Sequence, residues 1–199
     1  MTLHLITAPT ARPLMLPVVK AHLRVDGADE DAYLDSLIED ATARYDGRDG
    51  ILGRALVNQT WELRIAEFSD SISIPLPPLL SIISIKYDDV DDVEQTLATT
   101  VYESVDGGAG KSFIRLKADQ TWPSTYTWSD AVRIRYSAGY ATASGAGLSG
   151  TIPRPIIQAM LLRIGDLYAH RESFVTGMTI SDIKDYEVNL IAPYRVDWF

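Results

Sequence analysis

The chain has 199 residues, of which 46% are hydrophobic and 23% charged, and its formal net charge at pH 7 is −9. This composition suits a soluble protein with one substantial core and excludes a chain that is disordered throughout. The acidic balance argues against a protein that grips nucleic acid, because such binding needs Lys and Arg to displace counterions from phosphates. It does not argue against a protein past which DNA slides without sticking. The absence of cysteine excludes disulfides and thiolate metal sites.

Residues 1–16 have neither the basic start nor the apolar run of a secretory signal. The longest apolar stretches, around 76–85 and 156–164, contain polar residues or proline and are shorter than the roughly 20 residues that span a bilayer. We therefore expect no association with membranes.

Two helices are predicted near the start of the chain, a short one at Pro17–Val25 and a longer one at about Asp29–Asp49. In the longer segment, apolar residues recur at every fourth position, as they do on one face of a helix. These residues are Tyr33, Leu37, Ala41 and Tyr45. Acidic residues at the start of the segment and arginines near its end suit the helix dipole.

From residue 59 to residue 136, the period of the apolar residues changes to two. Trp61, Leu63 and Ile65 alternate with polar residues, and further alternating segments follow, separated by turn signals. About six short strands in succession predict an antiparallel sheet, folded as a small sandwich or an open barrel.

A second long helix is predicted after a loop rich in Gly, Ala and Ser at 138–150, because Ile156, Met160 and Ile164 repeat at helical spacing. A final helix is expected at about Ser181–Ile191. The predicted fold class is α+β: an α-helical bundle formed by the N- and C-terminal helices, with an inserted antiparallel β subdomain of about six strands. The predicted parts are 1–57 for the N-terminal helices, 58–140 for the β subdomain, and 141–199 for the C-terminal helices and tail.

No segment carries a convincing catalytic pattern. Gly110-Lys111-Ser112 resembles the end of a phosphate-binding loop, but Val105 stands where that loop needs its first glycine, and strands flank the segment on both sides. No nucleophile-elbow sequence is present. A cryptic carboxylate pair, as in glycoside hydrolases, stays open only because the chain has 27 acidic residues. We expect a protein that is not an enzyme, with no catalytic residue and no cofactor.

Metal sites are poorly supported as well. The three histidines, His4, His22 and His170, lie in separate segments. The acidic run Asp88–Glu94 lacks the spacing and the central glycine of a calcium-binding loop between two helices. A solvated hairpin turn is the preferred interpretation of this run, and we expect no bound metal.

Most aromatic residues of the β segment fall at inward positions of strands and favour core packing, with a carbohydrate-binding face as the alternative. The exception is 122–128, a long aromatic loop of a kind that suits a contact with another protein. Its candidate interface residues are Trp122, Tyr126 and Trp128.

The tail at 193–199 is also rich in aromatic residues. Since Tyr, Trp and Arg are enriched at interface hot spots, docking of the tail on a partner subunit is preferred, and folding back onto its own core is the alternative. The candidate interface residues of the tail are Tyr194, Arg195, Trp198 and Phe199.

A series of short segments, distributed nearly end to end, carries a resemblance to a known family. They include Leu16–Val25, Gly53–Leu56, Gln59–Leu63, Ile74–Leu79, Ile85–Asp89, Val132–Tyr136, Ala138–Tyr140 and Ala192–Arg195. In this order and spacing, they resemble the phage head-tail connector (adaptor) family, in the variant found in proteobacterial prophages and gene transfer agents. The chain departs from the family pattern at Ser181-Asp182-Ile183, where the family begins its last helix with a proline.

The resemblance implies an adaptor that forms a homo-oligomeric ring of twelve copies beneath the portal protein. Such a ring extends the DNA channel, lets DNA pass without specific binding, and docks the stopper or next tail-completion protein. The resemblance also implies a location in the neck of a virion or phage-like particle, at the head-tail interface, after assembly in the bacterial cytoplasm.

Two alternatives stay open at this point. One is a stopper or tail-terminator ring protein, a class that is more commonly β-rich throughout. The other is a carbohydrate-binding or receptor-binding module, which requires an exposed aromatic platform.

Overall fold

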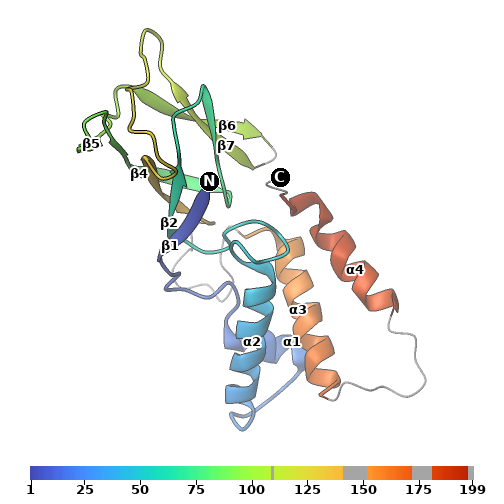
Figure 1. The fold of residues 1–199 in the computed structure, drawn as a ribbon. Coiled ribbons are helices and arrows are strands. Elements are labelled where there is room, and N and C mark those ends of the chain that lie inside the picture. Colours follow the sequence, from blue (N-terminus) through green and yellow to red (C-terminus); the bar gives the residue numbers. More distant parts are fainter. Residues whose placement is uncertain (109, 141–151, 172–180, 197–199) are drawn as a thin grey trace. The chain divides into compact units, whose positions relative to one another are not determined.

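The computed structural model describes residues 1–108, 110–140, 152–171 and 181–196, with the backbone alone for 181–185. Contacts between Cα atoms divide the chain into two compact units. We call the first, which comprises Met1–Thr10 and Asn58–Gly139, the β unit. The second, which comprises Ala11–Val57 and Tyr140–Phe199, is the helical unit. Figure 1 shows the strands of the one and the helices of the other.

The β unit contains two antiparallel sheets. The larger has the strand order β1-β2-β8-β4-β5 and the smaller the order β3-β7-β6. The strands of the larger sheet are β1 (Thr2–Thr7), β2 (Gln59–Ile65), β8 (Val132–Ala138), β4 (Leu79–Asp88) and β5 (Glu94–Thr96). Those of the smaller sheet are β3 (Ser71–Ile74), β7 (Lys111–Leu116) and β6 (Tyr102–Gly108).

Alternation along the central strand β8 gives the larger sheet an apolar face. Val132, Ile134 and Tyr136 are fully buried, and the residues between them are only partly buried. Trp61 and Leu63 of β2 lie opposite Tyr136 and Ile134, and both are buried. Because opposite residues in an antiparallel pair share a face, these side chains form one continuous apolar surface. The residues between them place their arginines and carboxylates on the other face.

The helical unit contains four α-helices among the described residues. They are α1 (Leu16–Leu23), α2 (Asp31–Tyr45), α3 (Arg154–Ala169) and α4 (Ser181–Ile191), followed by the short 3-10 helix η1 (Ala192–Tyr194). The described helices are all too short or too polar to cross a membrane.

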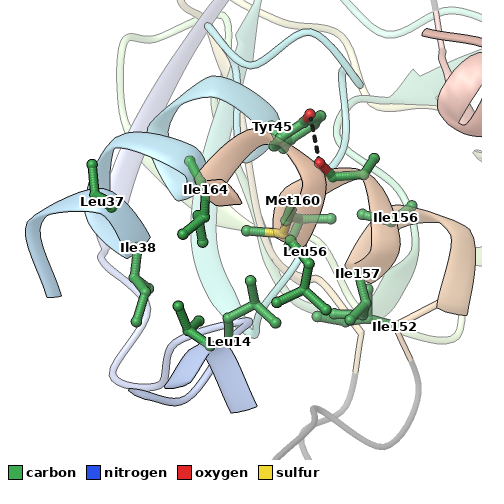
Figure 2. Packing of buried hydrophobic residues seen from close by; sticks show 14 of the residues in the cluster. Leu14, Leu37, Ile38, Tyr45, Leu56, Ile152, Ile156, Ile157, Met160 and Ile164 are labelled. Atoms are coloured by element: carbon green, nitrogen blue, oxygen red, sulfur yellow. Dashed lines mark hydrogen bonds between the residues drawn. The ribbon is translucent and has the colours of Figure 1, made fainter. Parts of the chain in front are cut away.

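The core of the helical unit lies where α2 and α3 pack together (Figure 2). Both helices carry apolar residues at intervals of three and four, which places these side chains on one face. The labelled contributions are Leu37, Ile38 and Tyr45 from α2 and Ile156, Ile157, Met160 and Ile164 from α3. Leu14, Leu56 and Ile152 add to the core from the segments that flank the helices. Burial of each such side chain stabilises the folded state by on the order of 1.5–3 kcal/mol.

The predicted fold class is wrong. The described residues do not form an N- and C-terminal helical bundle with a six-stranded insert. They form four short helices together with two separate antiparallel sheets of five and three strands, so the chain is mainly β-rich. The N-terminal segment also differs from the prediction, since Thr2–Thr7 is a strand of the larger sheet.

Two of the eight described strands, β1 and β5, are absent from the prediction for a physical reason. The strand β1 precedes the helices in the sequence, and its backbone is held by pairing with β2, so that Leu3 lies opposite Leu63. The strand β5 has only three residues, and all three side chains are exposed. Neither strand has a run of alternating apolar residues long enough to indicate a strand by itself.

Candidate interaction surface

The turn between β4 and β5 and the loop that precedes β8 lie next to each other in the β unit. The backbone N–H of Tyr126 donates to the carbonyl oxygen of Asp88 at 2.9 Å, and the N–H of Asp88 donates to the carbonyl of Ala131, also at 2.9 Å. These two bonds hold the loop at 120–130 against the last residue of β4. The aromatic loop predicted from the sequence therefore has a fixed position on the sheet.

Four large apolar side chains are exposed on these two segments. The exposed fractions are 61% for Val90, 52% for Val93, 43% for Tyr126 and 49% for Trp128, and we call these four residues the apolar patch. Val90 and Tyr126 line one surface hollow together with two threonines of the loop. Exposed aromatic and aliphatic side chains gathered in this way are typical of surfaces that contact another protein. The interface role of Tyr126 and Trp128 stays a prediction.

The acidic run beside the patch shapes the turn. One carboxylate oxygen of Asp89 accepts the N–H groups of Asp91 (3.0 Å) and Val93 (3.1 Å), and the other accepts the side-chain amide of Gln95 (2.8 Å). The hydrogen bond from Gln95 is the main reason why the pKa of Asp89 is lowered. Asp91 and Asp92 are exposed, so the apolar patch has a negatively charged border.

Potential metal ligands were compared only among the described residues. Within the described ranges, no group of three or more His, Asp or Glu residues has an arrangement that could hold a metal ion. His170 does lie four residues after Asp166 on α3, with Nδ1 3.2 Å from a carboxylate oxygen. This pair is two ligands at most, whereas a protein zinc site has three or four.

A nearly buried ion pair joins β8 to the last residue of β4, where the turn to β5 begins. Arg133 of β8 donates to both carboxylate oxygens of Asp88, at 2.7 and 2.6 Å, and to Glu94 of β5 at 3.0 Å. The exposed fractions of the Arg133 and Asp88 side chains are 17% and 9%. The two hydrogen bonds from Arg133 are the main cause of the lowered pKa of Asp88. The pair thereby ties β4 to the central strand β8, and the bond to Glu94 extends the connection to the edge strand β5.

Trp122 is partly buried, unlike Tyr126 and Trp128. Its ring stacks on Phe68 with a centroid distance of 4.6 Å and an interplanar angle of 3°, and Phe68 in turn meets Tyr87 edge-on at 5.8 Å. The indole N–H of Trp122 is buried and has no hydrogen-bond acceptor within the part of the chain that the structure describes. This geometry shows a packing role for Trp122 inside the β unit.

The described part of the tail lies on its own helical unit. The carbonyl of Tyr194 accepts a hydrogen bond from the Arg54 side chain. The N–H of Val196 donates to the carbonyl of Leu52 at 2.9 Å, and Val196 is 6% exposed. Arg195 is exposed between them. Trp198 and Phe199, the other two residues predicted for an interface in the tail, lie outside the described residues.

A second buried carboxylate lies on the charged face of the larger sheet. Glu62 of β2 is 5% exposed and accepts hydrogen bonds from Arg135 at 2.7 Å and from Arg64 at 2.9 Å. Burial by itself raises the pKa of Glu62, but the hydrogen bonds from the two arginines outweigh burial, and the net effect is a lowered pKa. Glu62 and Asp88 therefore both favour the ionised form in the folded state.

These two carboxylates predict how the stability of the β unit depends on pH. Because their folded pKa values lie below the usual values of 3.8 for Asp and 4.5 for Glu, their contribution is fully present above about pH 5 and is lost as pH falls through the lowered values. We expect the urea midpoint, followed by tryptophan fluorescence, to be flat from pH 7 to 5 and to fall steeply below pH 4. Asp88→Asn should weaken this fall. A wild-type midpoint that already declines between pH 7 and 5 would contradict the assignment.

Two residues of the patch, Val90 and Val93, were not among the predicted interface residues. The sequence does contain a signal for them, because they lie within the acidic run Asp88–Glu94. An apolar side chain placed in a charged two-strand turn has no core to enter. By contrast, the pairing of Asp88 with Arg133 joins residues 45 positions apart and depends on the sheet register.

No family model matches the chain, and no curated protein matches its sequence. Its fold is similar to that of a chain in the neck of an empty gene transfer agent (GTA) particle computed with C6 symmetry. The TM-score is 0.74 at 22% identity, over 100% of this chain and 97% of the other. A chain from the virion of a native GTA particle gives 0.69 at 20% identity, with the same coverage. A chain from the neck of a native GTA particle computed with C12 symmetry gives 0.68 at 20% identity, again with this coverage.

Proposed function

We propose that this protein is a structural connector subunit in the neck of a tailed phage or a phage-like particle such as a gene transfer agent. The observation that carries the proposal is the similarity in fold to neck chains over the full length of both partners. The specific form that we favour is an adaptor ring between the portal protein and the next tail-completion protein, located at the head-tail interface.

The symmetry of the similar structures and the net charge of this chain both support the proposed ring. The similar neck structures were computed with C6 and C12 symmetry, which suits cyclic assemblies whose subunits each present two different patches to their neighbours. A ring of twelve copies remains the form that we favour. The net charge of −9 suits a channel through which DNA passes without binding, since like charges repel. The proposed role needs no catalysis.

The β-rich composition gives weight to one alternative within the same class. Eight described strands in two sheets also suit a stopper or tail-terminator ring, in which β structure predominates. The helical unit, with its own core between α2 and α3, favours the adaptor. Electron microscopy separates the two, because an adaptor contacts the portal directly whereas a stopper requires an intervening ring.

The decisive experiment is electron microscopy of the full chain mixed with the portal protein encoded in the same genome. We expect a ring of this chain on the portal, with matching symmetry, and the same chain in purified particles by mass spectrometry. Absence of the chain from purified particles, together with no association with the portal, would refute the proposed function.

A variant of the apolar patch tests which surface makes the contact. The double variant Tyr126→Ala/Trp128→Ala should bind the portal more weakly, by about 30-fold or more. The reason is that one hot-spot residue typically contributes about 2 kcal/mol to binding. Sedimentation of the variant with and without the portal measures the change.

The matched control removes exposed apolar area from the same unit at a different place. Leu80→Ala with Ile83→Ala changes two side chains of β4 that are 41% and 53% exposed. This control should bind as the wild type does. Equal losses in both double variants would show that the effect is not specific to the patch.

A further inference from the structure

Four strands form the edges of the two sheets, and they differ in how well they are protected against pairing. The larger sheet ends at β1 and at β5, which pairs only with Lys86–Asp88 of β4, and the smaller ends at β3 and β6. An edge strand leaves every second backbone N–H and C=O group without a partner in its sheet, and these groups can bind the backbone of another extended chain.

Three of the four edges carry features that discourage such pairing. The strand β5 has only three residues, and its Glu94 forms ion pairs with Lys86 and Arg133. The strand β3 has only four residues. The strand β6 carries Glu103 and an aspartate and ends in two glycines. Short length, charge and irregular backbone are the usual means by which proteins protect an edge.

The remaining edge, β1, has none of the protection that charge or short length provides. Its six residues read Thr-Leu-His-Leu-Ile-Thr, without Asp, Glu, Lys, Arg, Pro or Gly. All of its side chains except that of Leu3 are exposed, including Leu5 at 47% and Ile6 at 42%. The register with β2 is regular from Thr2 to Leu5, and an irregularity occurs only between Leu5 and Thr7.

We propose that the free edge of β1 accepts an extended strand from a different protein of the particle, which becomes a sixth strand of the larger sheet. The recognition would come from backbone hydrogen bonds, with selectivity from alternate side chains. Leu3 and Leu5 lie opposite the buried residues Leu63 and Trp61. The incoming strand should therefore place apolar residues at every second position, on the face that it shares with Leu3 and Leu5.

A second copy of this chain is a poorer occupant for two reasons. Pairing of β1 with β1 is isologous and makes a closed twofold dimer, whereas a cyclic ring needs two different surfaces. A neighbouring copy would have to offer another edge. The strands β3, β5 and β6 are protected as described, and the outer side of β4 at 79–84, which β5 does not cover, is interrupted by two register irregularities.

Hydrogen exchange measured by mass spectrometry tests the proposal, which rests on the proposed function. The full chain is compared when free and when assembled in purified particles, for the peptide that covers β1. We expect exchange in this peptide to slow by about tenfold or more in particles, and the free chain at high concentration to show no such change.

Each other result has a defined meaning. Unchanged exchange in particles that contain the chain would overturn the strand proposal and leave the proposed function intact. Protection of β1 in the purified chain alone would identify a second copy as the occupant and overturn the proposal. Absence of the chain from particles would overturn both.

A variant adds the protection that β1 lacks. Ile6→Lys places a charge on the edge at an exposed position and should reduce the amount of chain in particles by about tenfold or more, without changing thermal unfolding. The control Ile83→Lys adds the same charge to β4, at a side chain that is 53% exposed. Normal incorporation of Ile6→Lys would overturn the proposal, as would an equal defect in both variants.

Discussion

Asp88→Ala is expected to destabilise the β unit by about 3–5 kcal/mol, because it leaves the nearly buried Arg133 guanidinium without its main partner. Glu94, at 3.0 Å and half-exposed, compensates only in part. The loss should be seen in urea unfolding followed by tryptophan fluorescence. Three of the four tryptophans, Trp61, Trp122 and Trp128, belong to the β unit, so this signal reports mainly on that unit.

The same unit contains a matched control for this prediction. Arg115 and Glu103 form an ion pair of similar length, 2.8 Å, but their side chains are 59% and 41% exposed. Glu103→Ala should cost less than about 1 kcal/mol, since solvent screens an exposed pair. Replacing both Asp88 and Arg133 with leucine should recover part of the loss, because no unpaired charge is then left buried. Equal costs for Asp88→Ala and Glu103→Ala would contradict the role of burial.

Glu187→Ala is expected to destabilise the helical unit by about 2 kcal/mol, a typical cost when buried hydrogen-bonding groups lose a charged partner. Glu187 of α4 is 4% exposed and accepts hydrogen bonds from the Tyr45 hydroxyl and from Arg44 Nε, the latter at 3.2 Å. These bonds tie α4 to the end of α2. Without Glu187, the fully buried Tyr45 hydroxyl keeps the carbonyl of Ala159, at 3.4 Å (Figure 2), and its interaction with the Arg44 side chain. Far-UV circular dichroism during urea unfolding measures the loss.

Two tyrosine variants provide the comparison for this prediction. Tyr45→Phe removes a hydroxyl that donates to the buried Glu187, and burial together with this carboxylate raises the pKa of Tyr45. Tyr168→Phe removes the same atom from a partly buried tyrosine, whose hydroxyl donates to Glu30. We expect Tyr45→Phe to cost about 1–3 kcal/mol and Tyr168→Phe to cost clearly less. Additive losses in the Tyr45→Phe/Glu187→Ala double variant would show that the pair is not coupled.

The helices were more predictable than the sheets. Apolar residues at every fourth position predicted a helix at 29–49, and α2 occupies Asp31–Tyr45 within this range. The last helix was expected at about Ser181–Ile191, where α4 is found. The buried face of a helix can be predicted from the sequence because its apolar residues recur at short, regular intervals. No local pattern in the sequence predicts how the strands separate into two sheets. That depends on which distant segments pair, as β1 does with β2.

The exposure of the candidate interface residues was predictable only in part, and their role in an interface stays a prediction. The aromatic loop drew attention to Tyr126 and Trp128, which are exposed, but the same reasoning included Trp122, which stacks on Phe68. Trp122 and Trp128 belong to one short loop, and only the fold determines which ring turns inward. Glu187 shows the same limit, because it reads as an ordinary helical carboxylate and is buried only through contact with Tyr45, 142 residues away.

The division of the helical unit into two stretches of sequence sets an order of events during synthesis. Tyr45 and Ala159, which meet in its core, are 114 residues apart. All residues of the β unit, up to Gly139, are therefore synthesised before α3. At translation rates of 5–20 residues per second, the apolar face of α2 waits on the order of ten seconds for its partner. During this interval, the nascent chain exposes Leu37 and Ile38 to other proteins, and a chaperone has time to bind there.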